Sequence, residues 1–400
     1  MRALKRFLSA ALAAPAMLTM LAAATAKADT VTVGILLPYS GPFARLADTM
    51  QKAIDLYVKQ HGDSAGGNQI VLLKRDTTGP NPDTAKRLAQ ELITRDKVQM
   101  LTGLVFTPNA LAIAPDITEA KIPTVIMNAA TAVITTKSPY FARTSLTLPQ
   151  TTEVFANWAA TKGGVKQAYT AVSDYGPGYD AEASFKLAFT NAGGTVVDSV
   201  RFPLANPDFA PFLQRVLDKK PQAVYVFIPG GPQQVQMVKT FHDLGLDKAG
   251  IRLLPSEEAA DEADEQNLPP FAVGMTTAMH YTEQHKSQAN QDFVKAWHAA
   301  YGANSDPDFF AVGAYDGMAL IYDTVKALNG KIDGDSAMIA MRGWKHESPR
   351  GPIMIDPETR DIVQNVYICR IEKVNGRLVN VEIATYPMVK DPWKERNKVQ

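Results

Sequence analysis

The sequence predicts an α/β protein made of two doubly wound lobes with crossovers between them, and three observations predict it. Short apolar strands rich in β-branched residues alternate with amphipathic helices over most of the chain, which is typical of parallel sheets covered on both faces. The roughly 370 residues after position 28 exceed what one hydrophobic core usually holds. The alternation then ends in a predicted hairpin, which suits two such lobes.

The first half of the chain contains the clearest strand and helix patterns. Asn81-Pro82 is typical of a helix start, because asparagine caps the first turn and proline fits there without losing a hydrogen bond. Apolar residues with helical spacing predict helices over Arg45–Gln60, from Pro82 to Ile93, and over Pro108–Ala120. The predicted strands are Val31–Leu37, Ile70–Lys74, Val98–Leu104 and Pro123–Met127.

The alternation continues as far as Pro255 and then changes. Strands are predicted at Ala168–Val172, Thr195–Phe202, Ala223–Ile228 and Ile251–Pro255. Helices are predicted at Gln150–Thr161, Gly178–Asn191, Asp208–Lys219 and Gln233–Leu244, and later near Asn290–Tyr301 and Asp308–Leu328. Two strands within Val363–Thr385 flank Asn375-Gly376, a dipeptide that favours the tight turn of a β-hairpin.

Residues 1–28 have the three parts of a secretory signal peptide. Three basic residues lie within the first six, the stretch Leu8–Leu21 is almost wholly apolar, and Ala26-Lys27-Ala28 has small residues at both outer positions of a cleavage site. The apolar run is shorter than the roughly 20 residues that span a bilayer, which argues against a retained anchor. We expect cleavage before Asp29 and a soluble periplasmic protein.

Composition excludes several classes of function. Loss of residues 1–28 removes four basic residues and leaves a small acidic excess, so no basic surplus would attract nucleic acid. Cys369 is the only cysteine and lies in an apolar run, which predicts a buried strand residue and no intrachain disulfide. The six histidines lack zinc-site spacing, and phosphate-binding and nucleophile motifs are absent. We expect no metal, no cofactor and no catalysis.

Three segments together resemble a known family. Val31-Thr-Val-Gly-Ile-Leu-Leu-Pro-Tyr-Ser-Gly-Pro42 is similar to the opening strand and turn of the leucine/isoleucine/valine-binding proteins, which are type I periplasmic solute-binding proteins of ABC transporters. Asn128-Ala-Ala-Thr131 resembles the loop that follows a strand in that family, and Tyr175-Gly-Pro-Gly178 resembles its Y-G-x-G segment. Their order and spacing extend the resemblance over nearly the whole mature chain.

The resemblance implies two three-layer αβα lobes joined by a three-strand hinge. The crossovers would fall near Ser145–Pro149, Met279–Thr282 and Ile353–Asp356. Lobe 1 would then hold residues 29–147 and 280–353, and lobe 2 would hold residues 148–279 and 354–395. The ligand would lie in the cleft between them, at the carboxyl ends of the strands, where open α/β sheets generally bind ligands.

The residues at two predicted strand ends suit an anionic ligand. Thr107 begins a predicted helix, so its hydroxyl and the nearby N–H groups can face a carboxylate, although an ordinary helix cap is an alternative interpretation. Ala129, Ala130 and Thr131 follow the next strand, and their small side chains allow the backbone to approach a ligand. The resemblance implies that Thr107, Ala129 and Thr131 occupy the carboxylate-binding positions of the family.

The predicted second lobe offers an aromatic and an acidic position. The resemblance implies one aromatic ligand contact, for which Tyr175 and Tyr179 both remain open, and places Gly230 where valine-type members carry another tyrosine. Glu257 or Glu258 would match the family's partner of a ligand ammonium. These two residues also begin an acidic run, which is usually a solvated helix face, so both interpretations remain.

The identity of the ligand stays open between two classes. Leu46 stands where amino-acid binders of the family place a tyrosine, and Phe106 precedes Thr107, so the entrance is more apolar. The segment Asp361–Gly376 and Asp391-Pro-Trp393 also resemble a subgroup, some members of which take up aromatic carboxylates. We expect either a branched-chain amino acid or an aromatic carboxylate.

The predicted function is capture of a small carboxylate for a membrane permease by closure of the two lobes of a monomer. One alternative is a sensor that reports the same ligand to a membrane receptor. A second is an α/β enzyme, which turnover of a bound ligand would reveal.

Overall fold

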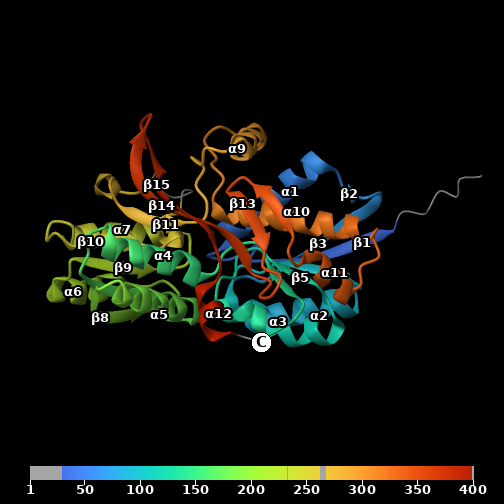
Figure 1. Cartoon of the computed structure of the whole chain (residues 1–400), viewed down its shortest axis with the longest axis horizontal. Helices are drawn as coiled ribbons and strands as arrows, with labels where there is room; N and C mark the ends of the chain where they lie inside the picture. The colour runs from blue at the N-terminus through green and yellow to red at the C-terminus, as the bar shows by residue number, and fades with distance from the viewer. Residues whose placement is uncertain (1–28, 232, 262–266, 399–400) are drawn as a thin grey trace, which may run out of the picture.

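The computed structural model describes residues 29–231, 233–261 and 267–398. Two lobes lie side by side along the longest axis of the molecule, and strands pass between them (Figure 1). Each predicted strand and helix between Val31 and Pro255 is present, with ends within two residues of the predicted ones. The predicted signal peptide lies outside the described residues.

Lobe 1 is built on a mostly parallel sheet of six strands in the order β2-β3-β1-β4-β5-β6. The strands are β1 Thr30–Leu37, β2 Ser64–Ala65, β3 Asn68–Asp76, β4 Met100–Gly103, β5 Thr124–Ile126 and β6 Phe141–Arg143. Its helices are α1 Ala44–His61, α2 Pro82–Thr94, α3 Thr107–Ala120, α10 Phe309–Ala327 and α11 Gly334–Met341. Helix α1 packs on α10 and α2 packs on α3, on opposite faces of the sheet (Figure 1).

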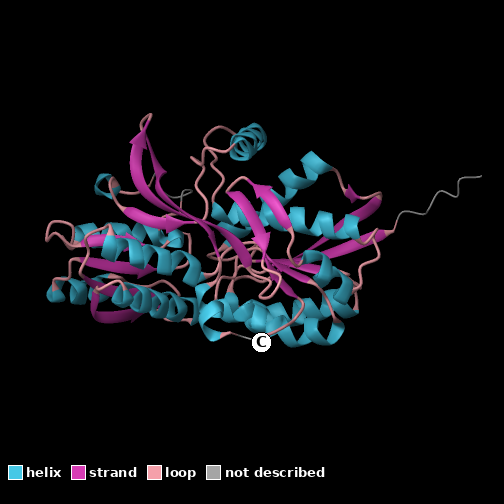
Figure 2. Cartoon of the chain, in the orientation of Figure 1, coloured by secondary structure: helices cyan, strands magenta, loops and turns pink. Residues whose placement is uncertain are grey.

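Lobe 2 contains a parallel sheet of four strands in the order β10-β9-β7-β8. The strands are β7 Gln167–Ser173, β8 Thr195–Phe202, β9 Ala223–Phe227 and β10 Arg252–Pro255. The helices are α4 Leu148–Thr161, α5 Gly176–Asn191, α6 Ala210–Lys219 and α7 Gln233–Asp243. Helices cover both faces of this sheet (Figure 2), so its central strand β9 is wholly buried.

An antiparallel sheet of five strands connects the lobes. Its strands are β11 Thr276–Met279, β12 Lys345–Ser348, β13 Gly351–Ile355, β14 Ile362–Val374 and β15 Arg377–Val389. Both Asn375 and Gly376 have positive φ, at 51° and 88°, which confirms the predicted hairpin between β14 and β15. Cys369 is buried in β14, as predicted. The remaining elements are α9 Gln288–Tyr301, α12 Pro392–Asn397, and the 3-10 helices η1 Ala132–Thr136, η2 Glu257–Ala259 and η3 Pro270–Ala272.

The buried side chains separate the two lobes and locate the passages between them. The core around sheet β1–β6 includes Ala142, Tyr281, Ile355 and Ile362. The cores around sheet β7–β10 include Leu146, Ala278, Val366 and Ile371. The packing therefore places the chain's three passages near residues 142–146, 278–281 and 362–366. The predicted third crossover, Ile353–Asp356, comes earlier in the chain than the last of these passages, in a segment that packs into the core of lobe 1.

A fully buried arginine ties two of these passages together. Arg350 donates to the carbonyl oxygen of Ser145 at 3.0 Å and to Oε1 of Gln364 at 2.8 Å, and it pairs with Asp316 at 2.7 Å. Removing one partner from such a buried ion pair is costly, because the remaining charge has no water to solvate it. Arg350 therefore fixes the first and third passages relative to each other.

Candidate ligand site between the lobes

The carboxyl end of β4 forms part of one wall of a cavity. The backbone turns at Gly103, where φ is 98° and an added Cβ would lie only 2.5 Å from the carbonyl oxygen of Leu36. This turn, which only glycine fits, brings Val105, Phe106 and Thr107 to the cavity. Because Thr107 is the first residue of α3, the positive end of that helix dipole lies at the cavity and favours an anion.

The loop that follows β5 is joined to the same wall. The side-chain amide of Asn128 donates to the carbonyl oxygen of Val105 at 3.0 Å, and the hydroxyl oxygens of Thr107 and Thr131 are 2.9 Å apart. Only one hydroxyl of such a pair donates to the other, so the second keeps its proton for another acceptor. The two loops thus form one polar surface on which one threonine hydroxyl can still donate a hydrogen bond.

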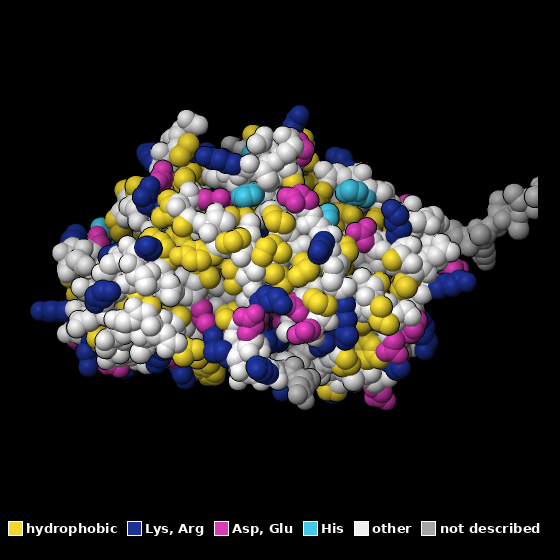
Figure 3. All heavy atoms as spheres, in the orientation of Figure 1, with side chains coloured by type: hydrophobic (Ala, Val, Ile, Leu, Met, Phe, Trp, Pro, Cys, Tyr) yellow, Lys and Arg dark blue, Asp and Glu magenta, His cyan; other side chains and the backbone are white. Residues whose placement is uncertain are grey.

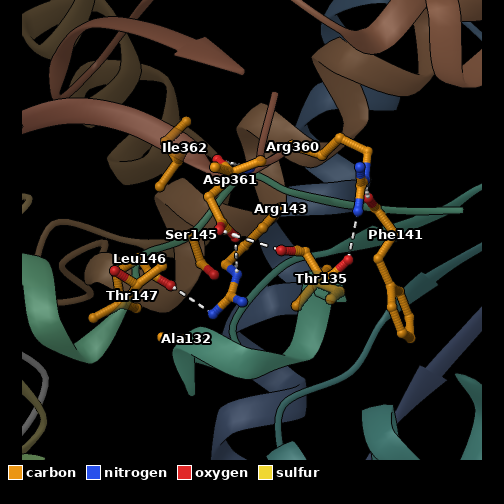
Figure 4. Close-up of polar contacts among 12 residues, drawn as sticks. Ala132, Thr135, Phe141, Arg143, Ser145, Leu146, Thr147, Arg360, Asp361 and Ile362 are labelled. Carbon is orange, nitrogen blue, oxygen red and sulfur yellow. Dashed lines mark hydrogen bonds and ion pairs between the residues drawn. The ribbon is translucent and has the colours of Figure 1, made fainter. Parts of the chain in front are cut away.

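Arg143, which lies at the end of β6, supports the backbone of this loop. Its guanidinium donates to the carbonyl oxygens of Ala129 at 2.9 Å and of Thr131 at 3.0 Å, and its Nε lies 3.0 Å from the carboxylate of Asp361. Figure 4 shows Arg143 between Asp361 and the chain segment that contains Leu146. Lys394 from α12 also pairs with Asp361, so the buried charges compensate one another.

Three strand ends of lobe 2 form the opposite wall. Tyr175 and Pro177 follow β7, Pro229 and Gly230 follow β9, and Glu258 follows β10. Because parallel strands end at the same edge of a sheet, these separate turns meet at one place. The cavity is therefore bounded by the carboxyl ends of both parallel sheets.

This cavity has a volume of about 20 Å³ and its wall contains most of the predicted site residues. The predicted residues on its wall are Leu46, Phe106, Thr107, Ala130, Tyr175, Gly230 and Glu258. They come from both lobes and from widely separated parts of the chain. That volume is well below the usual range for small-molecule sites, about 300–1,000 Å³, so the lobes must move apart to hold a ring-sized ligand.

The other four predicted residues do not line the cavity. Thr131 and Ala129 are buried beside it, where they contact Thr107 and Arg143 respectively. Tyr179 is 42% exposed, its hydroxyl donates to Asp174 and its ring lies against Arg201. Of the two candidate tyrosines, only Tyr175 therefore faces the cavity.

Glu257 is turned toward the passage between the lobes. Its carboxylate accepts hydrogen bonds from the backbone N–H of His280 at 3.1 Å and from His280 Nδ1 at 2.7 Å. Glu257, Glu258 and Asp261 are all buried, so the interpretation of their run as a solvated helix face is wrong for these three residues. The rest of the acidic run, residues 262–266, lies outside the described residues.

Sequence reasoning missed five residues on the cavity wall. They are Val105, Asn128, Pro177, Pro229 and Phe310. The first four are neighbours of predicted residues and could have been included as further strand-end positions. Phe310 lies at the start of α10, far along the chain, and its ring occupies the space beside Gly230, where an added Cβ would lie 2.9 Å from it. The aromatic side chain absent at position 230 is thus replaced from another element.

Glu258 is the only acidic side chain on the described cavity wall, and it lies among other acids. Burial, together with the negative charges of Glu257 and Asp261, raises its pKa well above the usual value. Its Oε2 is buried without a hydrogen-bond partner among the described residues. Burial and the nearby Glu258 also raise the pKa of Tyr175 well above its usual value.

An ion-pair network from both lobes lies near this acid. Arg45, adjacent to the cavity residue Leu46, pairs with Asp261 of lobe 2 at 2.5 Å and with Asp308 of lobe 1 at 3.5 Å. Both carboxylates are buried, and burial together with Asp261 raises the pKa of Asp308 to about 7. Arg45 thus connects the two lobes at the edge of the cavity.

One group of possible metal ligands lies away from the cavity. Glu283, His298 and Asp306 each place a ligand atom within 4.8 Å of the others. Asp306 also pairs with Arg377, so an arginine already compensates that carboxylate. The absence of a metal site stays a prediction. Among the described helices, none has the length and apolar character needed to cross a membrane.

Comparisons with known proteins agree with this architecture. The model of the family described as periplasmic binding protein matches residues 30–376. A "Leu/Ile/Val-binding protein homolog 6" from Brucella melitensis biotype 1 is 43% identical over 373 residues, which cover 93% of this chain and 95% of that protein.

Two solved structures are similar over almost their whole length. A solute-binding protein of an ABC transporter from Rhodopseudomonas palustris BisB5, in complex with 3,4-dihydroxybenzoic acid, is 48% identical with a TM-score of 0.88 and covers 92% of this chain and 99% of its own. A second, from R. palustris HaA2 in complex with p-hydroxybenzoic acid, is 42% identical with a TM-score of 0.89 and covers 92% and 100%. The chain therefore belongs to the periplasmic binding protein family and has the two-lobed type I fold.

Proposed function

We propose that this protein is the solute-binding component of an ABC transporter and that it captures a small aromatic carboxylate between its lobes. The cavity between the strand ends of the two sheets is the observation that carries this proposal. The two similar solute-binding proteins from R. palustris hold hydroxylated benzoic acids, which supports the same ligand class here.

The walls of the cavity suit an aromatic ring. Leu46, Phe106 and Phe310 from lobe 1 and two prolines from lobe 2 provide apolar surface for its faces and edges. Aromatic rings pack favourably against such side chains in offset or edge-on arrangements. The free Thr107–Thr131 hydroxyl proton and the start of α3 offer hydrogen bonds to the ligand carboxylate at one end.

A branched-chain amino acid makes a different demand on the same cavity. Its ammonium group needs an ionised carboxylate, and the raised pKa of Glu258 opposes that ionisation. Glu257 would be the other candidate, but it does not line the cavity, and its Oε2 is bound by His280. The charges on the wall therefore favour the aromatic acid.

The proposed mechanism is closure without covalent chemistry. The ligand enters between open lobes, the lobes rotate about the three passages, and contacts from both walls stabilise the closed form because the ligand binds it better than the open form. A membrane permease would then recognise the closed shape. This role requires export directed by residues 1–28, a monomer and no catalytic step.

Isothermal titration calorimetry of the purified protein tests the proposal. We expect micromolar or tighter binding of benzoate or 4-hydroxybenzoate, and no heat from leucine, isoleucine or valine. Chromatography of the recovered ligand should show it unchanged. Binding of leucine without binding of any benzoate would contradict the proposed ligand class, and turnover would contradict the non-enzymatic role.

A further inference from the structure

The carboxyl group of Glu258 has a buried oxygen without a hydrogen-bond partner among the described residues. The residue is 6% exposed and faces the cavity, and its Oε2 accepts no hydrogen bond from any described residue. A buried polar atom without a partner is costly, because it has lost its hydrogen bonds to water and gained none in return. A ligand group that hydrogen-bonds this carboxyl would remove that cost on binding.

The charges around Glu258 determine which end of the ligand meets it. Glu257 and Asp261 are close enough to oppose its ionisation, so a ligand carboxylate would be repelled from this wall. The other wall offers the Thr107 hydroxyl and the start of α3, which attract an anion. The ligand carboxylate therefore points toward Thr107, and the opposite edge of the ring points toward Glu258 and Tyr175.

We propose that Glu258 is a specificity-determining residue that hydrogen-bonds a hydroxyl group on the aromatic ring, opposite the ligand carboxylate. This inference rests on the proposed function and adds the substituent that the site selects. A protonated carboxyl has one donor and retains acceptor capacity, so it can donate to a phenolic oxygen and accept the phenolic proton. The adjacent Tyr175 phenol supplies a second polar group at the same end.

Calorimetry with three probes tests this inference. Benzoate, 3-hydroxybenzoate and 4-hydroxybenzoate are titrated into wild type, Glu258→Gln, Glu258→Leu and the control Glu119→Gln, which changes an exposed residue of α3. We expect wild type to bind one of the hydroxybenzoates at least about tenfold more tightly than benzoate, which corresponds to about 1.4 kcal/mol. Glu258→Gln, which keeps a donor and an acceptor, should retain most of this preference.

The leucine variant separates recognition from folding. Glu258→Leu should bind benzoate at least as tightly as wild type, which would show that the cavity is intact. It should bind the hydroxylated ligand and benzoate with about equal affinity. Retention of the preference in Glu258→Leu, or equal binding of all three probes by wild type, would overturn this inference alone. If wild type bound no benzoate of any kind, the proposed function would fall and this inference with it.

Discussion

At the scale of single residues, the site depends on polar groups whose partners are incomplete. Glu258 and Asn128 both line the cavity, and each has a buried side-chain oxygen without a hydrogen-bond partner among the described residues. Native proteins rarely leave such groups unpaired unless they have a function. These oxygens are therefore candidates for contact with a ligand.

The ionisation of Glu258 should appear in the pH dependence of stability. Its pKa is raised on folding, so its stabilising contribution is complete below the unfolded value near 4.5 and is lost as the pH rises through the folded value. Glu258→Gln removes this loss, so we expect the substitution to be more stabilising for the ligand-free protein at pH 8 than at pH 5. Thermal unfolding at both values measures the effect, and Glu119→Gln should show none.

The hydroxyl pair at the start of α3 should contribute to affinity. Thr131→Val removes the hydroxyl that pairs with the Thr107 hydroxyl. Without that partner the Thr107 hydroxyl is less firmly oriented and holds the ligand carboxylate less well. We expect about fivefold weaker binding of benzoate by calorimetry, since one buried hydrogen bond is worth about 1 kcal/mol. Thr161→Val, at the exposed end of α4, is the matched control. Unchanged affinity in Thr131→Val would remove this loop from the site.

At the scale of secondary-structure elements, the site is made from turns that follow strands, and these turns are held from behind. The loop after β5 has two of its carbonyl oxygens bound by Arg143, whose position depends on Asp361 at the start of β14. A neighbouring arginine, Arg360, binds the carbonyl oxygens of Phe141 and Thr135 (Figure 4). Only the first of these arginines contacts the ligand loop.

This difference predicts the effect of matched substitutions. Lysine cannot reproduce the fork of an arginine, so Arg143→Lys should lose at least one contact to Ala129 or Thr131 and loosen the loop. We expect about tenfold weaker ligand binding together with lower stability. Arg360→Lys should lower stability by about 1 kcal/mol, the worth of one hydrogen bond, but leave affinity within about twofold of wild type, because Arg360 binds neither Ala129 nor Thr131. Calorimetry and thermal unfolding distinguish the two outcomes, and equal losses of affinity in both variants would contradict the positioning role of Arg143.

The sequence predicted the elements that carry the site better than it predicted those that join the lobes. Strand β8 has both predicted ends, because its β-branched run is bounded by glycines and a proline. Strands β12 and β13 and helix α11 were not predicted, because they are short and their pairing depends on distant partners. Phe310 and Arg143 were missed because neither follows a predicted strand at the site. Phe310 lies in a helix far along the chain, and Arg143 lies in a short strand that was not predicted.

At the scale of the whole molecule, the two lobes meet in a closed arrangement held by charges as well as by packing. Arg45 of lobe 1 pairs with the buried Asp261 of lobe 2. The N–H of Ala132 in lobe 1 donates to Asp180 of α5 at 2.9 Å. On the face shown in Figure 3, basic and acidic side chains are interspersed over both lobes. Specific pairs thus connect the lobes, and the charges on this face are not divided by sign between them.

The pair between Arg45 and Asp261 should stabilise the closed form in which the ligand is held. Asp261→Asn weakens this connection without changing the cavity wall, so we expect affinity to fall by about five- to thirtyfold, which corresponds to 1–2 kcal/mol. Both benzoate and 4-hydroxybenzoate should lose affinity, and the loss should appear in faster dissociation, measured by stopped-flow fluorescence. Asp48→Asn, which breaks only an exposed pair within α1, is the control. A loss confined to one ligand would contradict this assignment.

A crystal structure of the protein grown with 4-hydroxybenzoate tests the central claim most directly. We expect the ring between Phe106 and Phe310 on one side and the prolines of lobe 2 on the other, with its carboxylate at Thr107 and its hydroxyl at Glu258. A ligand bound outside the space between the lobes, or with its carboxylate at Glu258, would contradict the account.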